Sequence, residues 1–316
     1  MLKTALFVMA LATPVSADVT GAVQDHALPG LARFAQATAD LAALDSCDPA
    51  ALQAGWATAF DAWLGVAHLR LGPVEEEGRV LAIAFWPDPK GIGARQTAAL
   101  LAAADPATLT PGHIAEQSVA ARGLFGMERL LFPATPLAGD YPCALTHALA
   151  DDLARMAQET QAGWQQGFAT ALEKPGPGQR YLSDLEAKQA LLTALVTGIE
   201  FNADARVARP LGSFDKPRPE RAEARASGRS ARNIALSLRA LADFATHLAP
   251  APKTAAALEQ AAKQAEAVDF ARLDDPQVWL KADILRQNIK AANDAAMAEL
   301  APALGVGVGF NAADGD

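Results

Sequence analysis

The spacing of apolar residues constrains the fold of this chain more than any other feature. They recur at intervals of three and four, as on a helix that buries one face. Such segments cover residues 23–44, 56–71, 95–104, 114–132 and 145–172 in the first half, and residues 182–208, 230–248, 254–268 and 276–301 in the second. No stretch alternates apolar and polar residues long enough to predict a sheet. We therefore expect an all-α protein.

The strongest break in this pattern is the run Lys174-Pro175-Gly176-Pro177-Gly178. It divides the chain into a predicted N-terminal bundle (18–173) and a C-terminal bundle (184–304), joined by a linker (174–183) and followed by a tail (305–316). Short connections that contain proline favour antiparallel neighbours within each bundle. We expect two tandem antiparallel helical bundles packed side by side, with a cleft between them in which a ligand can bind.

The first seventeen residues have the features of a secretory signal peptide. Lys3 supplies a basic start, residues 5–12 are largely apolar, and Val15-Ser16-Ala17 is a small-residue cleavage site. Because no later segment is long and apolar enough for a membrane span, we expect an exported protein that is soluble in a bacterial periplasm. In that oxidising compartment the two cysteines, Cys47 and Cys143, are expected to form a disulfide rather than stay free.

The charge balance argues against one class of partner. The chain has 27 Lys and Arg against 36 Asp and Glu, a formal net charge of −9. Duplex nucleic acid is bound by basic surfaces, so we expect no nucleic-acid partner.

One acid lies within an apolar helical face. Glu128 belongs to the segment GLFGMERLLF (residues 123–132), and its neighbours at helical spacing are Leu124, Phe125, Leu131 and Phe132. A buried carboxylate needs an arginine, a metal ion, several hydrogen bonds or a proton. The identity of that partner is central to the function.

Candidate partners lie in the second half. Five arginines concentrate positive charge beside two serines, Ser227 and Ser230, and an arginine can hold a carboxylate through two parallel hydrogen bonds. Ser230 also has the position of a cap for a helix that begins at Ala231. The alternative is that these arginines form only a solvated face. The five are Arg218, Arg221, Arg225, Arg229 and Arg232.

Several segments together resemble the imelysin family of bacterial exported proteins, over nearly the whole mature chain. The resemblance implies two tandem helical bundles, frequent regulation by iron, a grouping with metallopeptidases, and a site at the bundle interface. In this chain the site would comprise Glu128, with Trp86 and Asp88 at its wall and Arg225, Ser227, Arg229 and Ser230 opposite. The segments are GLFGMERLLF, WATAFDAWLGVAHLRLGPV, Phe85-Trp86-Pro87-Asp88, Arg225-Ala226-Ser227-Gly228-Arg229-Ser230 and the ending VGFNAADGD.

The chain departs from the family at its signature, in which a glycine is followed by a histidine two residues on and a glutamate three residues later. The corresponding residues here are Gly123, Phe125 and Glu128, so the acid is kept and the histidine is not. Phenylalanine has no lone pair to give a metal, so half of the ligand pair is missing. The string HExxH is also absent from the sequence.

We therefore expect a non-catalytic periplasmic protein that binds a metal ion or a small ligand between its bundles, with a role in iron uptake and with iron-uptake components as partners. The cofactor is unknown, and iron or another divalent ion is the candidate, with Glu128 as its ligand. A zinc-type metallopeptidase is the first alternative. A structural or partner-binding helical protein is the second. His68, which follows the aromatic residues of 56–63, either lines the cleft or is a hydrogen-bonded interior histidine.

Overall fold

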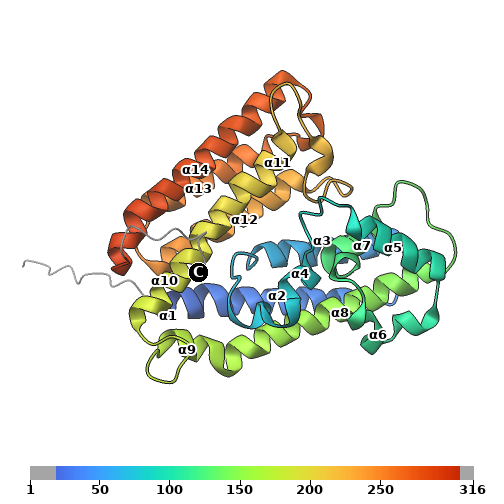
Figure 1. Cartoon of the computed structure of the whole chain (residues 1–316), viewed down its shortest axis with the longest axis horizontal. Helices are drawn as coiled ribbons and strands as arrows, with labels where there is room; N and C mark the ends of the chain where they lie inside the picture. The colour runs from blue at the N-terminus through green and yellow to red at the C-terminus, as the bar shows by residue number, and fades with distance from the viewer. Residues whose placement is uncertain (1–18, 307–316) are drawn as a thin grey trace, which may run out of the picture.

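The structure, a computed structural model, describes residues 19–306 and is built from helices and connecting loops (Figure 1). Within that range the backbone forms no β-strand, and the one β-type pairing is an isolated bridge between Ser213 and Lys216. The predicted all-α class is therefore confirmed. The predicted signal peptide and nearly all of the predicted tail lie outside the described residues.

The helices of the first half form the lower part of the view in Figure 1, coloured blue to green. A long helix that runs from α1 into α2 packs against α3 and against α8, and the short helix α7 packs on α3 and α8. The helices are α1 (Val19–Gly21), η1 (Ala22–Ala27), α2 (Leu28–Ala42), α3 (Pro49–Leu64), α4 (Arg79–Ile83), α5 (Ile92–Ala103), α6 (Pro111–Glu116), α7 (Gly123–Leu131), α8 (Tyr141–Gly163), η6 (Trp164–Phe168) and α9 (Ala169–Glu173).

The helices of the second half rise obliquely above the first half in Figure 1. The loop of residues 174–183 connects α9 to this set, in which α12 packs on α13, α13 on α14, and α10 on both α12 and α14. The helices are α10 (Asp184–Glu200), η7 (Phe201–Val207), α11 (Ala208–Leu211), α12 (Ser230–Leu248), α13 (Pro252–Glu266) and α14 (Pro276–Leu304). Short 3₁₀ turns η2 (Gly72–Val74), η3 (Glu76–Gly78), η4 (Pro106–Leu109), η5 (Val119–Ala121), η8 (Pro219–Arg221) and η9 (Phe270–Arg272) lie in the connections of both halves.

Several helices begin where the sequence supplies both a cap and a suitable first residue. Asp48 accepts hydrogen bonds from the backbone N–H groups of Ala50 and Ala51 at the start of α3, and Pro49 is its first helical residue. At the start of α14, Asp275 accepts a hydrogen bond from the backbone N–H of Gln277, and Pro276 is the first helical residue. A carboxylate satisfies the free donors of the first turn, and proline has no donor to lose there. These caps help set where the helices begin.

Three long helices contain a π-helical stretch in which the backbone is wider than in an α-helix. These stretches are η1, η6 and η7, and each continues directly into the α-helices on either side. Single π-helical turns inside α-helices are frequent at functional sites. In this protein η1 carries His26, and η7 carries Phe201 and Arg206.

Within residues 19–306, buried apolar contacts and three sets of polar links join the two halves. α12 packs against α3 and η1, which places the second half along the first. The links are between His26 and Asp243, between Asp61 and the pair Arg229 and Arg232, and between Glu128 and Ser227. Each of them joins a side chain of the first half to one of the second.

No described helix combines the length and apolar character that crossing a membrane requires.

Cys47 and Cys143 form the disulfide expected from the sequence, with their Cα atoms 5.7 Å apart. It ties the loop before α3 to the first turn of α8 across a sequence separation of 96 residues.

We predict that Cys47→Ser lowers the free energy of unfolding by up to ~4–5 kcal/mol, because an unlinked unfolded chain gains the entropy of a long open loop. Urea unfolding with and without dithiothreitol measures this. Cys143→Ser and the double variant serve as controls and should show the same loss, because each removes the same bond. An unfolding midpoint of the wild type that does not change on reduction would contradict the prediction.

Candidate functional site

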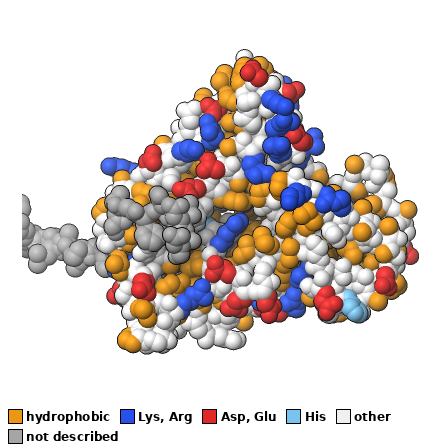
Figure 2. Space-filling view, viewed as in Figure 1, with side chains coloured by type: hydrophobic (Ala, Val, Ile, Leu, Met, Phe, Trp, Pro, Cys, Tyr) orange, Lys and Arg blue, Asp and Glu red, His pale blue; other side chains and the backbone are white. Residues whose placement is uncertain are grey.

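Two adjoining cavities open between the halves of the molecule. The first, of about 430 Å³, we call the Arg70 cavity, and the second, of about 580 Å³, we call the Glu128 cavity. Trp86, Phe125 and Arg209 line both, so the two cavities are neighbours. Figure 2 shows the hollow between the halves, with Lys and Arg side chains gathered around it.

Glu128 reaches the interface because α7 starts in a restricted position. Gly123, its first residue, has φ +58°, and a Cβ there would lie 2.2 Å from the carbonyl oxygen of Ala82. Only glycine fits such a conformation against neighbouring backbone. The other side of α7 is fixed by Trp56, whose indole N–H donates to the carbonyl oxygen of Leu124 at 2.9 Å. Glu128 is thereby held at the boundary of the halves, with 6% of its surface exposed.

The partner of Glu128 is Ser227 of the second half. The backbone N–H of Ser227 donates to Glu128 Oε1 at 3.0 Å, and its hydroxyl lies 2.7 Å from the same oxygen. The turn that presents these donors includes Ala224 at φ +48° and Gly228 at φ +70°. The second half therefore supplies the partner of Glu128, as expected. The prediction that this partner is an arginine is wrong, because the hydroxyl and backbone N–H of Ser227 bind the carboxylate instead.

This arrangement suits both protonation states of Glu128. The Ser227 hydroxyl is also 3.0 Å from the carbonyl oxygen of Ala224, and its single proton can serve only one acceptor. A carboxylate at Glu128 takes that proton, whereas a carboxylic acid can donate to Ser227 Oγ and leave the hydroxyl proton to Ala224. Burial raises the pKa of Glu128 above the ordinary 4.5, and the two hydrogen bonds from Ser227 only partly oppose this.

The loop around Trp86 forms one wall of the site. Trp86 meets Phe201 of the second half edge to face, with ring centroids 5.9 Å apart, and lines both cavities. Asp88 lines the Glu128 cavity, and its two oxygens accept the backbone N–H groups of Ile92 at 2.9 Å and Gly93 at 2.7 Å. Asp88 therefore caps α5, which leaves its carboxylate largely occupied.

The remaining residues named from the sequence have separate roles. Arg225 lines the Glu128 cavity, and within residues 19–306 its guanidinium has no hydrogen bond or ion pair. Arg229 pairs with Asp61 and lies over the rings of Trp56 and Phe60, so it fastens the interface. The hydroxyl of Ser230 donates to the carbonyl oxygen of Glu223 at 2.6 Å.

The cap expected from Ser230 is wrong, because Ser230 is itself the first residue of α12 and its hydroxyl makes no cap bond.

The residues around Glu128 do not fit a metal ion. Phe125 lines the same cavity in place of a histidine. Across the described chain, only Cys47, Cys143 and His147 bring three potential ligand atoms within 4.8 Å of one another, and the two thiols are consumed by the disulfide. A protein site for a divalent metal needs several such ligands together. In residues 19–306 the Glu128 carboxylate belongs to no such group of three.

Two histidines, His26 and His68, form a pair beside the Arg70 cavity, and only His68 was named as a candidate from the sequence. His26 Nε2 lies 3.0 Å from His68 Nε2, and His26 Nδ1 lies 2.7 Å from Asp243 Oδ2 on α12. His68 is buried and lines the cavity, so both interpretations of this residue hold. Burial, aided by the charge of His26, lowers the pKa of His68 well below 6.5. Only the folded chain brings His26 and Asp243 to it, which no sequence spacing reveals.

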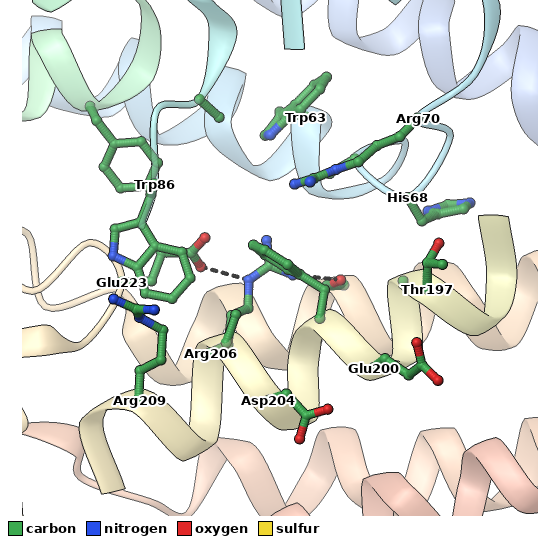
Figure 3. Close-up of a pocket in the computed structure, with 17 residues that line it drawn as sticks. Trp63, His68, Arg70, Trp86, Thr197, Glu200, Asp204, Arg206, Arg209 and Glu223 are labelled. Carbon is green, nitrogen blue, oxygen red and sulfur yellow. Dashed lines mark hydrogen bonds and ion pairs between the residues drawn. The ribbon is translucent and has the colours of Figure 1, made fainter. Parts of the chain in front are cut away.

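Three basic residues that line the Arg70 cavity were also missed: Arg70, Arg206 and Arg209. Figure 3 shows Trp63, His68 and Arg70 on one side, and Thr197, Arg206 and Arg209 on the helix opposite. Arg206 is neutralised by Glu223, with 2.8 Å between Nε and Oε2. One signal was readable in advance, since Arg70 follows the aromatic segment that includes Trp63 and His68.

Comparison with known proteins places these observations in a family. The family model described as Imelysin (Peptidase_M75) matches residues 25–309. An imelysin-like protein from Psychrobacter arcticum 273-4 has a similar structure, with a TM-score of 0.75, 20% identity, and coverage of 94% of this chain and 100% of that one. A second similar structure is that of a candidate iron-regulated protein A precursor from Parabacteroides distasonis ATCC 8503. It has a TM-score of 0.70 and 12% identity, and the match covers 92% of this chain and 97% of that one. No curated protein matches the chain.

We predict that Glu128→Gln is tolerated at pH 7, because an amide oxygen can accept both hydrogen bonds from Ser227 without a buried charge. Glu128→Ala should lower the free energy of unfolding by about 1–3 kcal/mol, because the backbone N–H and hydroxyl of Ser227 then lose their acceptor. The folded protein holds the proton of Glu128 more tightly than the unfolded chain, so wild-type stability relative to Glu128→Gln should rise as the pH falls toward 4.5. Urea unfolding across that range measures it. A stability difference that stays constant, or that moves the other way, would contradict the raised pKa.

We also predict that Phe125→His creates a metal site which the wild type lacks, because a histidine and a glutamate three apart on a helix can share one ion. Competition against a chromophoric zinc chelator should show tighter Zn²⁺ binding by Phe125→His than by wild type. The double variant with Glu128→Gln is the control and should lose the gain. Stoichiometric metal in the wild type that disappears in Glu128→Gln would contradict this prediction.

Proposed function

Because the chain belongs to the imelysin family, we propose that it is an exported, non-catalytic protein that binds a small ligand in the adjoining Arg70 and Glu128 cavities. The observation that carries this proposal is the lining of the cavities. Side chains from both halves meet there, and aromatic faces alternate with polar groups. The guanidinium groups of Arg70, Arg209 and Arg225 make no hydrogen bond or ion pair within residues 19–306. Concave sites of this size with a few unpaired polar groups are typical of ligand pockets.

The metal and peptidase alternatives have less support. A metallopeptidase needs a metal ion with an open position and a nearby base, and the described residues around Glu128 offer one carboxylate that Ser227 already occupies. A role connected with iron is supported by one similar structure, which is described as a candidate iron-regulated protein A precursor. We therefore place ligand binding first and an iron-related role second.

A purely structural role is the remaining alternative. It explains the links across the interface, such as Arg229 with Asp61, because those groups are paired within the protein. It does not explain why guanidinium groups line a cavity without partners. Unpaired charge at an interface is a cost that a structural role would not require.

The test is to fill the cavity. Ala205 lines the Arg70 cavity, whereas Ala256 is exposed on α13 and lines neither cavity. We predict that small molecules from a periplasmic extract raise the melting temperature of wild type and of Ala256→Trp, and that they do so much less for Ala205→Trp, whose added ring occupies the site. Differential scanning fluorimetry measures the shift. Native mass spectrometry identifies the bound mass.

Equal shifts in Ala205→Trp and wild type would show that the cavity is not the binding site. Hydrolysis of a peptide panel that Glu128→Gln abolishes would instead favour the peptidase.

A further inference from the structure

Two guanidinium groups at the Arg70 cavity, those of Arg70 and Arg209, make no hydrogen bond or ion pair within residues 19–306. The guanidinium of Arg70 lies 4.6 Å from the centroid of the Phe201 ring, and within residues 19–306 it has no hydrogen bond or ion pair. The guanidinium of Arg209, across the cavity in Figure 3, likewise makes no hydrogen bond or ion pair with the described part of the chain, and its Nε is buried. Arginines in such a position ordinarily hold a carboxylate or a phosphate through paired hydrogen bonds.

The acids that line this cavity are directed elsewhere. Figure 3 shows the carboxylates of Glu200 and Asp204 pointing away from Arg70, and Asp204 pairs with Lys290 of α14 at 3.2 Å. The third acid, Glu223, accepts hydrogen bonds from Arg206 at 2.8 Å and from Asn233 at 3.1 Å. Within residues 19–306 none of the three forms a hydrogen bond or ion pair with Arg70 or Arg209, although the charge of Glu223 partly offsets that of Arg70.

The environment of Arg70 also favours an incoming anion. Burial and, less strongly, the neighbouring charge of Arg206 lower the pKa of Arg70 below its ordinary value, and the charge of Glu223 opposes this only in part; the group stays charged at neutral pH. A bound anion would replace the hydration that burial removes from the guanidinium.

The rest of the lining sets the shape of the ligand. Trp63, Trp86, Phe125 and Phe201 supply flat apolar faces, and the indole N–H groups of the two tryptophans have no acceptor within residues 19–306. Flat rings stack well on such faces, whereas a small hydrated ion would leave them in contact with water.

We infer that the Arg70 cavity binds an organic anion with a flat, unsaturated or aromatic body, whose carboxylate is held by Arg70 while Arg209 adds charge from the opposite half. This inference rests on the proposed function and specifies its ligand class. Because Arg70 and Arg209 belong to different halves, such a ligand also bridges the two bundles.

The inference is tested by isothermal titration with three probes. Indole-3-acetate carries both the ring and the charge, indole-3-acetamide carries the ring alone, and acetate carries the charge alone. We expect indole-3-acetate to bind at least roughly tenfold more tightly than either of the others. Equal binding of the acetamide, or no binding of indole-3-acetate, overturns the inference.

Variants locate the anion. Arg70→Gln should weaken indole-3-acetate binding at least roughly tenfold. Arg70→Lys should weaken it by less, because lysine keeps the positive charge, and Arg209→Gln should also weaken it by a measurable amount. Arg180→Gln is the matched control, since Arg180 lies 5.2 Å from the centroid of the Phe168 ring but outside this cavity. Circular dichroism confirms that each variant folds. Unchanged affinity in Arg70→Gln, or a loss confined to Arg180→Gln, overturns the placement.

The same measurements separate this inference from the proposed function. If Ala205→Trp abolishes binding of a periplasmic ligand that proves neutral, the anion inference fails and the binding function stands. If Ala205→Trp changes no ligand's binding, both fail.

Discussion

A carboxylate buried where the two halves meet needs hydrogen-bond donors, and in this protein the opposite half supplies them. Glu128 and Ser227 are far apart in the sequence, yet two hydrogen bonds to one oxygen join them. An unsatisfied carboxylate at this depth would cost several kcal/mol, so the turn that carries Ser227 is held against α7. With His26 bound to Asp243 and Asp61 to Arg229, the halves are tied at separate places, and cavities lie beside the apolar core that the two halves share.

The helical architecture was predictable because periodicity and capping are local. Apolar spacing indicated each long segment, and residues such as Asp275 and Pro276 lie where a helix begins. The inward position of Glu128 followed from the same periodicity, since its neighbours at three and four residues are apolar. The π-helical stretches η1, η6 and η7 were not predictable, because apolar spacing does not distinguish a π-helical turn from the α-helix around it.

The pairing of charges in the site could not be read from the sequence. Five arginines near Ser227 made a guanidinium the expected partner of Glu128, but Arg229 and Arg232 are taken by Asp61 on α3. Burial would raise the pKa of Asp61, and the hydrogen bonds from these two arginines outweigh that effect and lower it. Which acid meets which arginine is decided by the packing of α12 on α3, and composition carries no information about it.

Phenylalanine at position 125 changes what a buried glutamate can do at this interface. A histidine there would face the cavity together with Glu128 and offer a second ligand to a metal. Phe125 instead packs edge to face on Phe60, with ring centroids 5.5 Å apart, and adds an apolar wall to both cavities. Glu128 is then left with a role in holding the two halves together, and the unpaired charge in the site belongs to arginines. A site with this balance favours anions with apolar bodies over cations, because the groups that would bind a cation are already engaged within the protein.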